Sequence, residues 1–174
     1  MMKNILVLVC LILLATTALS QTRSRTTKRS APAKTTVTAA DQAIALARTT
    51  GATKVADQIK NLTRFLYLLG GVAKGIEEFD ARRSEASPAG LQKNDQNKAA
   101  VKTSLENVRV GLDQLEIHFR GTQGLESYYL KLAGSASGAA TAESQAAAGH
   151  FDQAGRTLLG VVNRLTDVLV AMRQ

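Results

Sequence analysis

The stretch VADQIKNLTRFLYLLGGVAKGI, residues 55–76, decides the fold, because its large apolar residues recur at alternating spacings of four and three. This period places them on one face of an α-helix, as in the seam of a coiled coil. The positions of this seam are Val55, Ile59, Leu62, Leu66, Leu69, Ala73 and Ile76. The stretch therefore predicts an amphipathic helix that packs against other helices.

Two later stretches repeat this period. The first seam consists of Val101, Leu105, Val108, Leu112, Leu115 and Phe119, and the second of Phe151, Ala154, Leu158, Val161, Leu165, Val168 and Met172. Because polar residues cover the opposite faces, the three seams predict an all-α fold, an elongated antiparallel bundle over residues 38–174. The sequences SPAG (87–90) and GTQG (121–124) are short connections typical of antiparallel neighbours. We expect Pro88 and Gly90 to exclude helix from the first connection.

The chain between the second and third seams has two interpretations. After Leu132 the sequence becomes GSASGAATAESQAAAG, in which the apolar residues are mostly alanines. The alanines favour one long, bent helix over residues 125–173, whereas the glycines favour two helices that separate near Gly134 and Gly138. The first interpretation, which we prefer, gives three long helices, and the second gives a four-helix bundle.

The first 20 residues have the order of a secretory signal peptide. Lys3 precedes an apolar run of eleven residues from Ile5 to Ala15, and the small-residue pattern Ala18-Leu19-Ser20 follows it. A membrane-spanning helix needs about 20 apolar residues, so the run is too short to cross a bilayer. We expect cleavage after Ser20 and export, with an uncleaved N-terminal membrane anchor as the alternative. Cys10, the only cysteine, would leave with the peptide.

Residues 21–37, QTRSRTTKRSAPAKTTV, carry much of the net positive charge. They contain five basic residues and no acidic residue, whereas residues 38–174 contain 16 basic and 14 acidic residues. With few apolar residues, this segment is expected to be a disordered linker. Its cations are Arg23, Arg25, Lys28, Arg29 and Lys34. They serve either a solvated spacer or a tether to an anionic partner, such as phospholipid headgroups or an envelope polymer. Nucleic acid is disfavoured, because the segment has no aromatic residue to stack on bases.

The helix predicted over residues 55–76 is apolar around more of its circumference than one seam requires. Phe65, Leu68 and Val72 lie beside the seam, and Gly71 and Gly75 would let another backbone approach closely. Two interpretations remain open. Either this helix is buried on most sides, or this extra face pairs with a second copy or with a partner helix.

Residue clusters with catalytic or metal-binding chemistry are not evident in the sequence. His118 and His150 are far apart, and neither follows a carboxylate by three residues, as a di-iron bundle requires. We expect His118 to lie near a helix end, where partial positive charge suits the helix dipole. Glu78 and Arg82, four residues apart, predict a surface ion pair. We therefore predict no catalytic residue, no metal site and no cofactor.

These features predict a non-enzymatic helical-bundle protein that is exported, either to the periplasm or out of the cell. It would act as a binding or structural module in the cell envelope or outside the cell. An anionic envelope component or another protein is the expected partner, and the extra apolar face is compatible with a homo-oligomer. The alternative is a membrane-active or lipid-binding bundle whose amphipathic helices open onto a bilayer surface.

Overall fold

The computed structural model describes residues 38–173, and over this range the chain is helical without a strand. The predicted signal peptide (1–20) and basic linker (21–37), with all five of the linker's cations, lie outside the described residues. The elements in chain order are α1 (Ala39–Ala81), the short 3-10 helix η1 (Arg83–Glu85), α2 (Pro88–Gly121), α3 (Glu126–Leu132), α4 (Ser135–Ala147) and α5 (Phe151–Arg173). The prediction of an all-α bundle is confirmed for this part of the chain.

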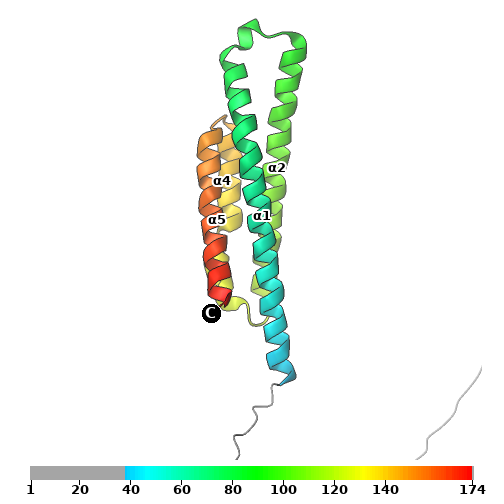
Figure 1. Ribbon diagram of the computed structural model, residues 1–174, viewed down its shortest axis with the longest axis vertical. Helices are drawn as coiled ribbons and strands as arrows, with labels where there is room; N and C mark the ends of the chain where they lie inside the picture. Colours follow the sequence, from blue (N-terminus) through cyan, green and yellow to red (C-terminus); the bar gives the residue numbers. More distant parts are fainter. Residues whose placement is uncertain (1–37, 174) are drawn as a thin grey trace, which may run out of the picture. The chain divides into compact units, whose positions relative to one another are not determined.

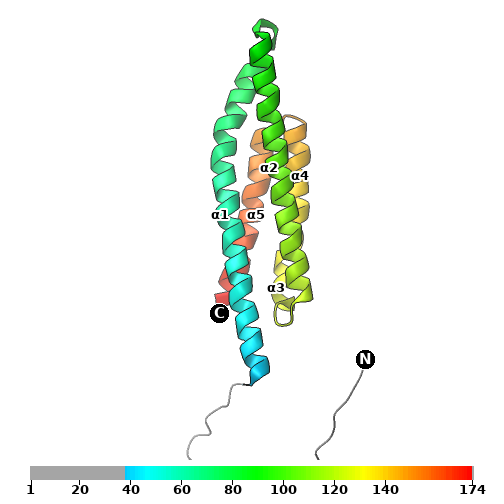
Figure 2. The same ribbon diagram turned by 90° about the vertical axis from the view of Figure 1, so that its right-hand side faces the viewer.

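The helices form an up-and-down bundle (Figures 1 and 2). Helix α1 packs against α2 and α5, and α4 packs against the same two helices from the other side. The short helix α3 continues the direction of α4 and packs against α2 and α5. Four antiparallel segments therefore surround one core. The preferred arrangement of three long helices is wrong, and the four-helix variant is the one that forms.

The single long helix expected over residues 125–173 is interrupted twice. Gly134 and Gly149 have φ angles of 87° and 83°, in the left-handed region that glycine adopts without strain. At the first interruption, the Arg164 side chain donates a hydrogen bond of 2.6 Å to the carbonyl of Ala133. This bond satisfies a backbone acceptor that the break removes from the helix. The second interruption is the hairpin that turns the chain back from α4 into α5.

The two longest helices begin at capping residues. The backbone N–H of Asp41 donates to Thr38 Oγ1 at 3.2 Å, and the N–H of Thr38 donates to Asp41 Oδ2 at 3.1 Å. This reciprocal pair is a capping box. In α2, Ser87 Oγ accepts from the N–H of Gly90 at 3.2 Å. The expectation that Pro88 and Gly90 exclude helix is wrong for both residues, because α2 begins at Pro88 and contains Gly90. Proline is tolerated in the first helical turn, where its missing N–H needs no partner.

The predicted seams supply the core. Every position of the last seam is buried, from Phe151 to Met172. In the first two seams, Ile59, Leu66 and Val108 are half-buried and the other positions are buried. Helix α4 contributes the small buried residues Ala139, Ala142 and Ala146. The alanines therefore let α4 approach α2 and α5 closely, because they add no bulk between the helices.

Helices α1 and α2 extend beyond the turn between α4 and α5 (Figures 1 and 2). Polar contacts join the two helices in this extension. Asn94 of α2 is 3% exposed, and its Nδ2 donates to Asp80 Oδ1 of α1 at 2.8 Å. The ammonium of Lys98 lies 2.7 Å from the other oxygen of the same carboxylate. Asp80 therefore ties α1 to α2 where the second pair of helices no longer covers them.

Candidate functional site

An apolar groove runs between α1 and α2 on their outer side. It encloses about 230 Å³ and is lined by Phe65, Leu68, Leu69, Val72, Asn97, Ala100, Val101 and Ser104. Leu68 and Val72 remain 57% and 37% exposed, and Tyr67, which follows Leu66 on α1, is 83% exposed. Helices α3, α4 and α5 contribute no residue to its lining. The structure thus leaves an apolar face of α1 uncovered within residues 38–173.

Three of the five residues predicted from the sequence meet in this groove. Phe65, Leu68 and Val72 line it, whereas Gly71 and Gly75 lie on the exposed side of α1 beside it. A Cβ atom added at either glycine would have no neighbour within 4 Å among the described residues. The interpretation that α1 is buried on most sides is therefore wrong for this segment.

The contribution of α2 to the groove was not anticipated from the sequence. Asn97, Ala100 and Ser104 are small or polar and fall outside the apolar seam of α2. The only signal that they carry is their helical spacing of three and four, which places them on one side of the seam. Their small side chains keep the groove open above Val101.

Charged residues flank the exposed face of α1 on both sides of the groove. Lys60 Nζ lies 3.2 Å from Asp57 Oδ1, and Lys74 Nζ lies 3.8 Å from Glu78 Oε1. The predicted ion pair between Glu78 and Arg82 is not formed, because the Arg82 side chain donates to the backbone carbonyl of Glu78 at 3.4 Å instead. All these groups are exposed, so the local pairs contribute little to folding.

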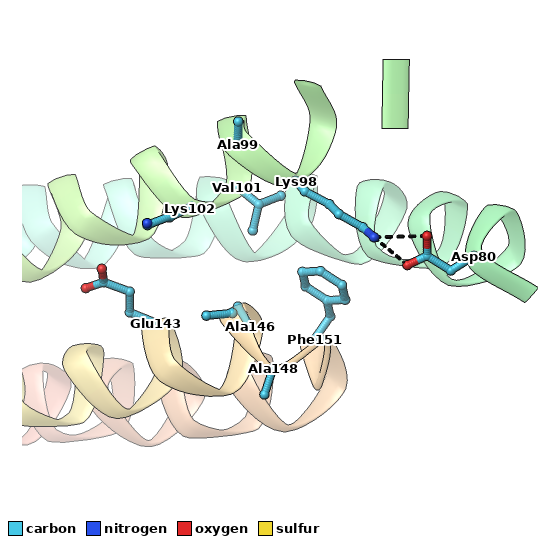
Figure 3. A pocket seen from close by; sticks show the side chains of 11 residues that line it. Asp80, Lys98, Ala99, Val101, Lys102, Glu143, Ala146, Ala148 and Phe151 are labelled. Atoms are coloured by element: carbon cyan, nitrogen blue, oxygen red, sulfur yellow. Dashed lines mark hydrogen bonds and ion pairs between the residues drawn. The ribbon is translucent and has the colours of Figure 1, made fainter. Parts of the chain in front are cut away.

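A second hollow, of about 530 Å³, lies where the α4–α5 turn meets the extended part of α2 (Figure 3). Asp80, Lys98, Lys102 and Glu143 are its charged residues, and the ring of Phe151 forms part of its wall. The hydrogen bond from Lys98, more than any other contact, holds the pKa of Asp80 below its ordinary value.

The Glu143 carboxylate lies 3.1 Å from Arg109 Nε. Both carboxylates of this hollow are thus engaged by basic side chains of α2.

His118 lies near the end of α2 with one ring nitrogen buried. Its Nδ1 is 3.4 Å from Thr122 Oγ1, while its Nε2 is buried without a hydrogen-bond partner in the described part of the chain. Burial, and secondarily the charge of Lys54, lower the pKa of His118. The expectation of partial positive charge is therefore wrong, because the neutral imidazole is favoured.

Residues 38–173 contain neither a cluster of metal ligands nor a membrane-spanning helix. No group of three or more His, Cys, Asp or Glu side chains in this range is arranged to hold a metal ion. None of its helices combines the length and apolar character needed to cross a bilayer. The groove between α1 and α2 is thus the candidate site with the clearest chemistry, that of an apolar contact surface.

Comparison with known proteins adds no relative to this picture. No protein-family model, no curated protein and no solved structure matches the chain.

Proposed function

We propose that the chain is an exported, non-enzymatic helical bundle that acts as a binding or structural module in the cell envelope or outside the cell. In this proposal residues 1–20 are a signal peptide, and residues 21–37 tether the bundle to an anionic surface. The segregation of charge carries the proposal. Five cations without an anion occupy residues 21–37, whereas the sequence from 38 onward is close to balanced.

The residue at which α1 begins supports the proposal that the basic segment and the bundle have separate roles. The capping box between Thr38 and Asp41 begins the bundle directly after the basic segment. Each Lys or Arg near an anionic surface contributes on the order of 1 kcal/mol. Five such residues would strengthen attachment by on the order of a thousandfold, with a strong dependence on salt because the interaction is Coulombic.

Cosedimentation with vesicles of mixed neutral and anionic phospholipid tests the tether. High salt should abolish binding of the natural sequence to these vesicles. Binding should also be lost when Gln replaces all five basic residues of the segment: Arg23, Arg25, Lys28, Arg29 and Lys34. A control variant that shuffles residues 21–37 keeps all five charges and should bind like the natural sequence. Equal binding by the neutralised variant would exclude the tether.

Export is tested separately in the producing cells. Fractionation followed by N-terminal sequencing should find a chain that begins at Gln21 and is released by a high-salt wash. Retention after the wash with the first residues intact would instead identify residues 1–20 as an anchor.

The exposed apolar residues of α1 favour one other function, that of a membrane-active bundle. Leu68, Val72 and Tyr67 would enter the acyl region of a bilayer if the bundle opened onto it. Release of dye from anionic vesicles would support this alternative. Full retention of dye at high protein concentration, with the protein bound, would exclude it.

A further inference from the structure

Exposed apolar side chains are concentrated on one short stretch of α1. Tyr67, Leu68 and Val72 are among nine large apolar residues exposed in the described range, yet they lie within two turns of one helix. The other six are spread over α1, α2, α3 and α5. A concentration of this kind beside an apolar groove marks a surface that another molecule covers.

The two glycines on the same face, Gly71 and Gly75, have open space where a side chain would lie. Leu68, Gly71 and Gly75 are spaced by three and four residues and so share one side of α1. A glycine inside a helix costs about 1 kcal/mol relative to alanine. Neither glycine is required by a neighbour within residues 38–173, because each has open space around it. Close approach of a second helix would explain the absence of side chains at both positions.

The order of charges along this face is self-complementary in one orientation. Asp57 and Lys60 precede the apolar stretch, and Glu78 and Arg82 follow it. Suppose that a second α1 lies antiparallel to the first and that the two-fold axis passes midway between Leu68 and Gly71. Asp57 then comes opposite Arg82 of the second copy. Lys60 comes opposite Glu78 of that copy to within one residue. A two-fold axis makes each of these contacts twice.

Charge also specifies the direction of pairing. In an in-register parallel pair, Asp57 would face Asp57 and Lys60 would face Lys60, which is unfavourable. The antiparallel register contains no such like-charge contact among these four residues, and it brings the cations Arg64 and Lys74 of the two copies opposite each other to within one residue. Residues 57–81 of α1 span about 38 Å at 1.5 Å per residue, a length over which two helices can make continuous contact.

We infer that two copies of this chain form an antiparallel dimer through the outer face of α1, with Leu68, Val72 and Tyr67 covered by the second copy. The inference does not rest on export or on the basic segment, because the residues that carry it lie in α1 or, for Arg82, directly after it. The exposed ion pairs set the orientation, and the apolar side chains supply most of the binding free energy.

Sedimentation of the protein purified from producing cells, over a range of concentrations, tests the inference. The natural sequence should dimerise. Leu68→Glu should weaken the dimer on the order of a hundredfold, because it places two charges in the apolar contact. The matched control is Leu159→Glu on α5, since Leu159 is 52% exposed and outside the face. This control should dimerise like the natural sequence.

Charge exchange tests the antiparallel register. Lys60→Glu should weaken the dimer by on the order of tenfold, and adding Glu78→Lys to the same chain should restore it. Helical circular dichroism of each variant confirms that the bundle is folded.

A natural sequence that stays monomeric at every concentration overturns the inference. So does a dimer that Leu68→Glu and Leu159→Glu weaken equally, or one that the charge exchange does not restore. A monomer that binds lipid vesicles through Leu68 would assign this face to a membrane instead.

Discussion

Gly138 of α4 faces Val161 of α5 so closely that a Cβ atom at position 138 would lie 2.8 Å from Val161 Cγ2. Carbon atoms in contact prefer a separation of about 3.5–4.0 Å. Helix α4 can therefore occupy its place against α5 only because position 138 has no side chain. The neighbouring buried residues Ala139, Ala142 and Ala146 extend the same close packing along α4.

Substitution at Gly138 should therefore destabilise the bundle. Gly138→Val is expected to lower the free energy of unfolding by about 2 kcal/mol, within the range for an overpacked core. Chemical denaturation measures this change. Gly155→Val on α5 is the control, because its added Cβ meets no atom within 4 Å. Equal stability of the two variants would show that α4 can move away from Val161 at no cost.

Substitution by alanine should change stability in opposite directions at Gly149 and Gly160, because the two glycines differ in backbone conformation. An added Cβ meets nothing within 4 Å at either position, but Gly149 has a φ of 83° and Gly160 lies inside α5. Gly149→Ala should lower the free energy of unfolding by about 1 kcal/mol, because a left-handed conformation is strained for alanine.

Gly160→Ala should raise the free energy of unfolding by as much as about 1 kcal/mol, because alanine favours the helix. Thermal unfolding of both variants measures the two signs. A stabilising Gly149→Ala would mean that the α4–α5 turn does not require the left-handed conformation.

The polar contacts of Asp80 should stabilise the extended part of α1 and α2. Asp80→Ala removes the partner of Lys98 and leaves the buried amide of Asn94 without its acceptor. We expect the free energy of unfolding to fall by about 1 kcal/mol, since a buried group without a hydrogen bond is costly while the ion pair itself is partly exposed.

Hydrogen exchange of the amides in residues 76–98 locates this loss. The extended part should exchange faster in Asp80→Ala, whereas the exposed control Asp95→Ala should match the natural sequence. Unchanged protection in Asp80→Ala would show that apolar contacts alone hold the two helices together.

Acidification should weaken the bundle through His118. Burial lowers the pKa of this histidine in the folded chain, so the unfolded chain takes up a proton at higher pH than the folded chain. The free energy of unfolding is therefore expected to decrease as the pH falls below about 6.5, the ordinary value for histidine. Asp80, whose pKa is also lowered, would add to this loss only below its ordinary value of 3.8.

Replacement of His118 measures how much this histidine contributes to the dependence of stability on pH. His118→Gln, which cannot titrate, should reduce the dependence of unfolding on pH between 7 and 5. His150→Gln, at an exposed position between α4 and α5, is the matched control. Denaturation curves across this pH range for both variants provide the measurement, and the same slope in His118→Gln and the natural sequence would contradict the assignment.

The sequence by itself determined the helical class and the buried faces. Spacings of three and four determine which side of a helix is apolar before any neighbour is present, so the seam from Phe151 to Met172 is buried at every predicted position. The cap at Thr38 is likewise local, because both partners lie within one turn. The apolar excess at Phe65, Leu68 and Val72 was also visible, since it depends only on residue type and position along α1.

Only the tertiary structure decided where residues 125–173 turn and which faces stay uncovered. Glycine tolerates both helical and left-handed conformations, so the sequence around Gly134, Gly138 and Gly149 does not say which of them break the helix. Packing against α2 and α5 determines which of these glycines interrupt the helix. Gly138 stays helical and lies against α5. Gly134 separates α3 from α4 without reversing the chain, and Gly149 lies in the turn that reverses it, so that α4 and α5 pack in one core.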